Sequence, residues 1–185
     1  MSQIERFDPK TYSLNPVSGS GLNATEPAVS PDGGKLAFVA DGGLYLYEGG
    51  RRTILAPGPV VDPAFFPDGN RIAFVRGAPG RRSIAAISTS GGEIRTLVED
   101  RDCFEPAVSP DGLRLAFACS ATGARQVWVR DLTSGVARRL TSGFCNNDRP
   151  AWDPDSQSIV FAWVCSRDVG LPALYRARVT DSGAG

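Results

Sequence analysis

The sequence predicts an all-β protein, a β-propeller built from four repeats that each form one four-stranded antiparallel blade. The first observation is a Pro-Ala-x-x-Pro-Asp phrase, followed by glycine in three of its four copies, which begin at Pro27, Pro63, Pro106 and Pro150. The copies are 36, 43 and 44 residues apart, which is the length of a four-stranded blade. The second observation is that a short apolar run containing phenylalanine follows every copy.

Each repeat is expected to run as strand, tight turn, strand, loop, strand, turn, strand. The Pro-Asp-Gly unit predicts the tight turn, because Pro fixes φ, Asp bonds to its own backbone and Gly accepts a positive φ. Four equivalent aspartates are therefore assigned to turns: Asp32, Asp68, Asp111 and Asp155. The phenylalanines after the turns should pack between blades rather than bind a ligand: Phe38, Phe74, Phe117 and Phe161.

Alternating segments further along each repeat predict the remaining strands. Third strands are expected at 44–47, 83–87, 127–129 and 173–178, and fourth strands at 52–55, 94–97 and 137–140. The repeats then cover about residues 27–60, 63–102, 106–147 and 150–180 of a single domain spanning 1–185.

The fourth repeat lacks a fourth strand, and we predict that the N-terminal segment supplies it. Residues 8–18 align without a gap with residues 131–141, which form the last strand of repeat 3. A strand near residues 12–17, within a partial blade at 4–26, would complete the fourth blade and close the ring, which removes unpaired sheet edges. Residues 4–7 resemble a third strand, however, so a longer propeller or a ring made with a second copy stays open.

The four cysteines form two symmetric pairs, because each pair is centred on the turn aspartate of its own repeat. Residues equidistant from a hairpin turn face each other across antiparallel strands. We predict the disulfides Cys103–Cys119 and Cys145–Cys165, with the cross-blade pairs Cys103–Cys145 and Cys119–Cys165 as the alternative. Buried free thiols are a further alternative, and a zinc site is disfavoured because zinc ligands usually come in close pairs. Disulfides would indicate an oxidising compartment, although residues 1–10 lack the features of a secretion signal.

Composition excludes several functions. The chain contains no histidine, so Ser-His-Asp and Cys-His catalysis and histidine-ligated metal sites are impossible within it. Lys plus Arg equals Asp plus Glu at 20 each, which lacks the positive charge of a nucleic-acid-binding protein. No apolar run is long enough to cross a bilayer. We therefore expect no catalysis, no nucleic-acid partner, no membrane insertion and no obligatory cofactor.

A carboxylate stands immediately before the first proline of repeats 1 to 3 and one residue earlier in repeat 4: Glu26, Asp62, Glu105 and Asp148. First strands line the channel of a propeller, so these side chains should gather near one of its mouths. Such a ring could hold Ca²⁺ or receive a basic group from a partner. The alternative, which we favour, is that the carboxylates cap strand entries and pair with arginines such as Arg149.

The repeated Glu-Pro-Ala-x-Ser-Pro-Asp-Gly phrase resembles the TolB-like family of β-propeller repeats, a WD-like class also found in propellers attached to prolyl oligopeptidase-type enzymes. The resemblance covers about residues 4–180. It implies a propeller, usually outside the cytoplasm, that binds protein partners or accompanies an enzyme. Propellers of this family commonly have six blades, and this chain departs from them with four complete turn motifs.

We therefore expect a non-catalytic scaffold that binds a protein or peptide through its loop faces, as a monomer, in the bacterial periplasm or elsewhere outside the cytoplasm. The alternatives are a carbohydrate-binding or carbohydrate-active propeller that uses the channel-mouth carboxylates, and the accessory propeller of a larger hydrolase. A cavity of converging acids would favour a sugar, and a flat loop surface a protein partner. Trp163 and the loop at 166–172, which breaks the repeat, form an irregular segment of the kind that often carries function.

Overall fold

The structure, a computed structural model, describes residues 2–18, 22–99, 101–165 and 173–179. Within these ranges the chain forms 17 β-strands, which pair in five antiparallel sheets. None of the described segments forms a helix of the length and apolarity that a membrane span requires.

Three of the sheets are complete blades, and a fourth has three strands among the described residues. Blade 1 consists of β3 (Ala24–Val29), β4 (Lys35–Ala40), β5 (Gly43–Glu48) and β6 (Arg51–Ala56). Blade 2 consists of β7 (Val60–Phe65), β8 (Arg71–Arg76), β9 (Ser83–Ser88) and β10 (Arg95–Val98). Blade 3 consists of β11 (Cys103–Val108), β12 (Arg114–Thr122), β13 (Ala124–Asp131) and β14 (Ala137–Arg139). Blade 4 consists of β15 (Asn146–Trp152), β16 (Ser158–Val164) and β17 (Ala173–Arg178).

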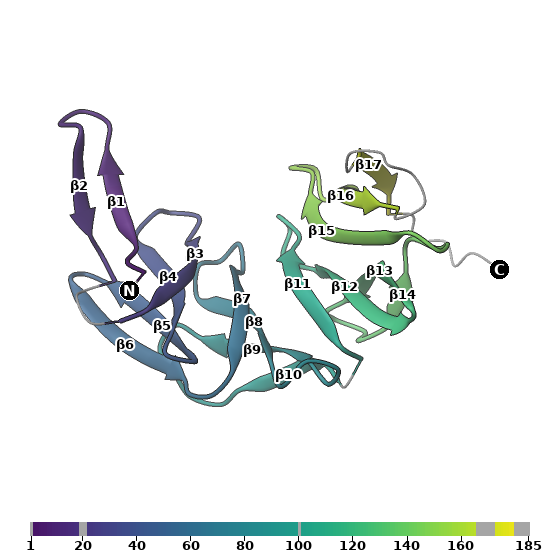
Figure 1. The fold of residues 1–185 in the computed structure, drawn as a ribbon, viewed down its shortest axis with the longest axis horizontal. Helices are drawn as coiled ribbons and strands as arrows, with labels where there is room; N and C mark the ends of the chain where they lie inside the picture. The colour runs from purple at the N-terminus through teal and green to yellow at the C-terminus, as the bar shows by residue number, and fades with distance from the viewer. Residues whose placement is uncertain (1, 19–21, 100, 166–172, 180–185) are drawn as a thin grey trace.

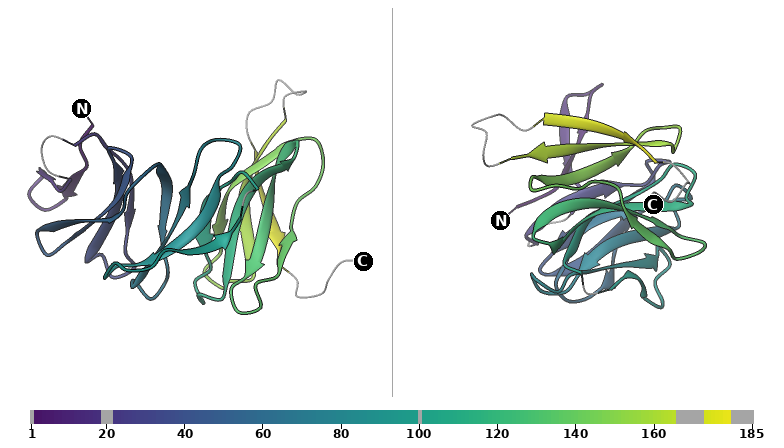
Figure 2. Two further views of the ribbon diagram at one scale, coloured as in Figure 1. Left: turned by 90° about the horizontal axis from the view of Figure 1, so that it is seen from below. Right: turned by 90° about the vertical axis from the view of Figure 1, so that its right-hand side faces the viewer.

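The blades follow one another along an open arc rather than a closed ring (Figure 1). The first strands β3, β7, β11 and β15 lie on the inner side of the arc, and the last strands β6, β10 and β14 lie on its outer side. The views in Figure 2 place the N-terminal hairpin and blade 4 at opposite ends of the arc. The inner side is therefore the surface to which every blade contributes its first strand.

The prediction that an N-terminal strand completes blade 4 is wrong. The strand β2 (Ser13–Pro16) pairs with β1 (Glu5–Asp8) in a two-stranded sheet of their own. The turn between β1 and β2 nevertheless matches that after β13, because Asp8 accepts the N–H of Lys10 as Asp131 accepts that of Thr133. The N-terminal segment therefore resembles the last hairpin of a blade, but each of its strands pairs with its neighbour in sequence. A local hairpin costs less loop-closure entropy than pairing across the molecule.

The blades pack through the phenylalanines of their second strands, as predicted. Phe38, Phe74 and Phe117 are almost fully buried, and Phe161 is 7% exposed. Phe74 belongs to a cluster shared by blades 1 and 2, and Phe117 to one shared by blades 2 and 3. Phe161 packs in the same way with residues of blade 3. Phe74, Phe117 and Phe161 therefore each join their own blade to the preceding one. Phe38 instead packs in a cluster that includes Ile4 and Leu22.

The turn aspartates also lie where the sequence predicts them. In every blade the aspartate carboxylate accepts the backbone N–H two residues later, at 2.8 to 3.0 Å. Glycine follows in three blades with φ between 66° and 74°, and Ser156 takes the same left-handed conformation in the fourth with φ 60°. The turn chemistry therefore fixes the first hairpin of each blade.

Candidate functional site

Each first strand contains a β-bulge at the residue before its first proline. The register between first and second strands shifts at this point in all four blades. The residues there have φ between 52° and 54°: Glu26, Asp62, Glu105 and Arg149. A positive φ is strained for a residue other than glycine and persists only where the surrounding structure stabilises it. Its recurrence indicates a structural requirement common to the four blades.

The bulges place these residues in a hydrogen-bonded ladder that links successive blades. The N–H of Asp62 donates to Glu26 Oε2 at 2.5 Å, and the N–H of Glu105 donates to Asp62 Oδ2 at 2.9 Å. The N–H of Arg149 donates to Glu105 Oε2 at 2.6 Å. We call Glu26, Asp62, Glu105 and Arg149 the carboxylate ladder. Each carboxylate thus satisfies the backbone donor of the next blade.

Asp148, the fourth carboxylate predicted from the sequence, does not join the ladder. Its side chain is 9% exposed and forms an ion pair with Arg125 Nη1 at 2.7 Å. The ladder position of blade 4 is occupied by Arg149, whose side chain is 82% exposed. The Nε atom of Arg149 lies 3.9 Å from Glu105 Oε1, as expected if the carboxylates pair with neighbouring arginines.

The ladder gives no geometric support to a calcium site. The described residues contain no group of three or more Cys, Asp or Glu side chains placed to hold a metal ion. The ladder carboxylates lie one per blade and each faces a backbone donor, whereas Ca²⁺ requires six to eight converging oxygens. Calcium binding stays a prediction from the sequence.

A cavity of about 420 Å³ opens beside the ladder. Residues of blades 1 to 3 line it: Glu26, Val61, Asp62, Arg82, Phe104, Glu105, Ser120 and Arg125. We call it the ladder cavity. It brings together three of the four carboxylates that the sequence singles out, and it adds two arginines and an aromatic ring that sequence reasoning missed.

The two arginines of the ladder cavity are already paired with carboxylates outside it. Arg82 Nε lies 2.8 Å from Asp102 Oδ1, and Arg125 pairs with Asp148 as described above. The hydrogen bond from Arg82 is the main cause that lowers the pKa of Asp102. Both guanidinium groups also flank the buried ring of Phe104, at 5.0 and 5.6 Å from its centroid. Their positive charges are therefore largely compensated.

The carboxylate of Glu105 in the same cavity has much less compensation. Burial raises the pKa of Glu105, and the negative charges of Asp148 and Asp62 raise it further. The N–H of Arg149 acts in the opposite direction, but the net pKa shift is upward. A raised carboxyl pKa indicates that the ionised form lacks stabilisation in the folded protein. A cationic group beside Glu105 would stabilise its ionised form.

The structure places the four cysteines in two disulfides, Cys103–Cys119 and Cys145–Cys165. Cys103 and Cys119 lie directly opposite each other on β11 and β12, with their Cα atoms 4.1 Å apart. The second bridge lies just beyond the paired ends of β15 and β16, with a Cα separation of 4.6 Å. These are the pairs that the symmetry of the sequence predicts, and each spans the first hairpin of its blade.

Trp163 belongs to the irregular segment of repeat 4. It is half-buried, and its ring lies 5.7 Å from that of Tyr175. The loop at 166–172, an irregular segment of the kind that often carries function, lies outside the described residues.

Solved structures with the same architecture include TolB from Acinetobacter baumannii, with a TM-score of 0.78 and 22% identity over 95% of this chain and 46% of that one. A TolB-type protein from Agrobacterium tumefaciens gives a TM-score of 0.80 and 27% identity over 95% of this chain and 65% of that one. An oligogalacturonate lyase in complex with manganese gives a TM-score of 0.74 and 22% identity over 97% of this chain and 54% of that one. The chain spans 46 to 65% of the length of these proteins.

No curated protein sequence matches the chain at a significant level. The family model of the TolB beta propeller domain, PD40, matches residues 47–185, which is more than half of the chain. The match agrees with the repeated turn phrase, the four-stranded blades and the structural similarity to TolB. The chain belongs to the TolB beta-propeller domain family.

Proposed function

We propose that this TolB-type propeller is a non-catalytic scaffold that binds a protein or peptide, and that the partner places a lysine or arginine side chain in the ladder cavity. One observation carries the proposal: three consecutive blades each bring a carboxylate to the same cavity, while the arginines there are neutralised by other partners. The absence of histidine supports a binding role over acyl transfer by a histidine-dependent triad.

The ladder leaves acceptor capacity for a partner. A carboxylate has two oxygens with about four lone-pair positions, and the ladder bond uses one oxygen of each side chain. Among the described residues, no hydrogen bond reaches the second oxygen of Glu26 or Asp62. A partner cation could therefore bind without breaking the links between blades.

Amide variants separate the structural role of the ladder from binding. Glu26→Gln, Asp62→Asn and Glu105→Gln together keep an oxygen acceptor for each ladder bond and remove three negative charges. Random twelve-residue peptides displayed on phage would be selected on the native chain. We expect selected peptides to be enriched in Lys and Arg and to bind the triple variant at least tenfold more weakly, with its melting temperature preserved. Selected peptides without that enrichment, or equal binding to both proteins, would contradict the proposal.

A neutral oligosaccharide is the second candidate ligand. The observation in its favour is that the ladder cavity is a hollow lined by three acids rather than a flat surface. Against it, the one aromatic ring lining the cavity, Phe104, is buried between two guanidinium groups and offers no open face for a sugar. Calorimetric titration with neutral oligosaccharides distinguishes the two ligands, because we expect no heat from them in a protein that retains peptide binding.

We propose that the protein acts in the periplasm or another extracytoplasmic compartment. Two disulfides are typical of proteins from oxidising environments. Mass spectrometry of protein extracted from its native cells with thiols blocked checks this proposal. We expect all four cysteines to be unblocked and bridged, whereas four blocked thiols would contradict an oxidising location.

A further inference from the structure

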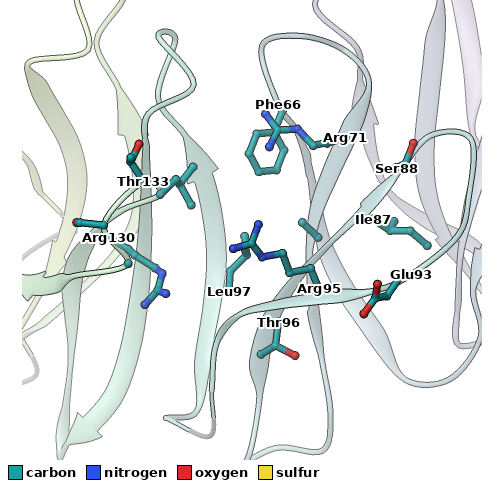
Figure 3. Close-up of a pocket in the computed structure, with 14 residues that line it drawn as sticks. Phe66, Arg71, Ile87, Ser88, Glu93, Arg95, Thr96, Leu97, Arg130 and Thr133 are labelled. Carbon is teal, nitrogen blue, oxygen red and sulfur yellow. The ribbon is translucent and has the colours of Figure 1, made fainter.

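A second cavity, of about 410 Å³, lies between blades 2 and 3 (Figure 3). Its walls come from β9 and β10 on one side and from the turn between β13 and β14 on the other. Two of its lining residues, Phe66 and Arg71, flank the Pro-Asp-Gly turn of blade 2. It shares no lining residue with the ladder cavity. We call it the interblade pocket.

The interblade pocket is lined by three arginines and one carboxylate, that of Glu93. Arg71 is already engaged, because its Nη2 lies 3.0 Å from Asp68 and its guanidinium lies 4.0 Å above the ring of Phe66. Within the described part of the chain, neither Arg95 nor Arg130 has an ion pair or a side-chain hydrogen bond. Two guanidinium groups thus remain available in one pocket.

These two groups belong to different blades. Figure 3 shows the guanidinium of Arg95 directed from blade 2 toward the side of the pocket where Arg130 lies. The guanidinium of Arg130 lies against the neighbouring turn, where a Cβ on Gly135 would come within 3.0 Å of Nη2. Glycine at this position therefore leaves the room that Arg130 occupies. The hydroxyl group of Thr133 adds a further hydrogen-bonding group to the same wall.

Apolar residues also line the pocket. Phe66 and Ile87 are almost fully buried there, and Leu97 and Leu132 are half-buried. Such a combination suits a ligand with an anionic group at one end and an apolar body at the other, because each part meets its complement.

We infer that the interblade pocket binds an organic oxyanion, with a phosphate or carboxylate group held by Arg95 and Arg130 and an apolar portion resting on Leu97 and Leu132. A planar guanidinium can donate two parallel hydrogen bonds to such a group, which makes arginine well suited to this recognition. The inference does not depend on the ladder cavity, which carries carboxylates and would repel the same ligand.

Titration calorimetry and NMR with four probes test the inference: phenyl phosphate, benzoate, inorganic phosphate and the neutral compound benzyl alcohol. We expect phenyl phosphate or benzoate to bind at least tenfold more tightly than inorganic phosphate, because only the organic anions can also contact the apolar residues. The neutral probe should bind at least tenfold more weakly than the anions. Which anion binds more tightly distinguishes a phosphate ligand from a carboxylate ligand.

Three variants locate the site. Arg95→Gln and Arg130→Gln should each weaken binding of the tighter probe about tenfold or more, since each removes a charge-assisted hydrogen bond. Arg139→Gln is the matched control, because Arg139 is exposed on β14 and does not line the pocket. Amide NMR spectra confirm that each variant is folded. Absence of binding by both organic anions, or equal loss in all three variants, would overturn the inference.

Discussion

The ladder positions of blades 3 and 4 have the same backbone and opposite side-chain chemistry. Glu105 has φ 54° and Arg149 has φ 52°, and both sit at a bulge before a proline. Glu105 accepts the N–H of the next blade, whereas Arg149 donates its N–H to Glu105 and leaves its own side chain 82% exposed. The repeat therefore preserves the backbone conformation at the ladder position. The residue type decides whether its side chain can accept a hydrogen bond from the next blade.

An ion pair between Arg125 of blade 3 and Asp148 of blade 4 also links these two blades, and breaking that pair should have the largest effect. Arg125→Gln leaves the carboxylate of Asp148, whose side chain is 9% exposed, without its cation. We expect a loss of about 2 kcal/mol in the free energy of unfolding, less than for a fully buried pair because Arg125 is half exposed. Urea denaturation measures it. Asp148→Asn combined with Arg125→Gln should recover most of the loss, and a double variant as unstable as the single one would contradict this account.

Removing the ladder acceptor of blade 3 should have the next largest effect. Glu105→Ala leaves the N–H of Arg149 without its acceptor, which we expect to lower the free energy of unfolding by about 1 kcal/mol. Glu105→Gln is the matched control, because an amide oxygen can still accept that bond. Equal stability of the alanine and glutamine variants would show that the ladder bond contributes nothing.

Glycine substitutions at Arg149 and Glu105 separate the cost of the positive φ from the contribution of the ladder hydrogen bond. Arg149→Gly removes a strained positive φ without removing a ladder acceptor, so we expect a gain of about 0.5 kcal/mol. Glu105→Gly relieves the same strain but also loses the hydrogen bond from the N–H of Arg149. We therefore expect the Glu105→Gly variant to be less stable than the Arg149→Gly variant. Thermal unfolding of both variants measures the difference. Equal changes in melting temperature would show that the Glu105 carboxylate does not stabilise the link between blades 3 and 4.

The pH dependence of Glu105 gives the smallest effect. Its folded pKa is raised, so the folded state is penalised at neutral pH, and the penalty is lost as the pH falls through the folded pKa toward the ordinary value. Glu105→Gln should therefore be slightly more stable than the native chain at pH 7 and no more stable at pH 4. Urea midpoints of both proteins at the two pH values check this. A stability difference in favour of Glu105→Gln that increased on acidification would contradict the prediction.

The fold could be predicted from the sequence because its determinants are local. A turn aspartate such as Asp111 needs only the N–H two residues later, and the cysteines Cys103 and Cys119 are paired by their equal distance from that turn. The partner of the N-terminal strand could not be predicted, because residues 4–7 and 173–178 both have the pattern of a third strand and a strand pattern does not identify the partner. Pairing of β2 with β1 depends on proximity along the chain.

The site could be predicted only in part. The carboxylates Glu26, Asp62 and Glu105 stand out because they recur before a proline, but their bonds to the next blade depend on a positive φ that a residue before proline rarely adopts.

Arg125 has a counterpart in repeat 2, because Arg82 holds the equivalent position at the start of the third strand. Their partners differ, since Asp148 stands one residue before the bulge of blade 4 and Asp102 three residues before that of blade 3. An arginine that recurs with a partner at a changing position leaves no periodic signal for the pair.

The titration of Glu105 tests most directly whether the ladder cavity binds a basic group. NMR of the side-chain carboxyl carbons would follow the pKa of Glu105 with and without trilysine as the probe. We predict a pKa above the ordinary glutamate value in the free protein and a fall on adding trilysine, because a bound ammonium group stabilises the carboxylate. A pKa at or below the ordinary value in the free protein, or one that trilysine leaves unchanged, would contradict the account.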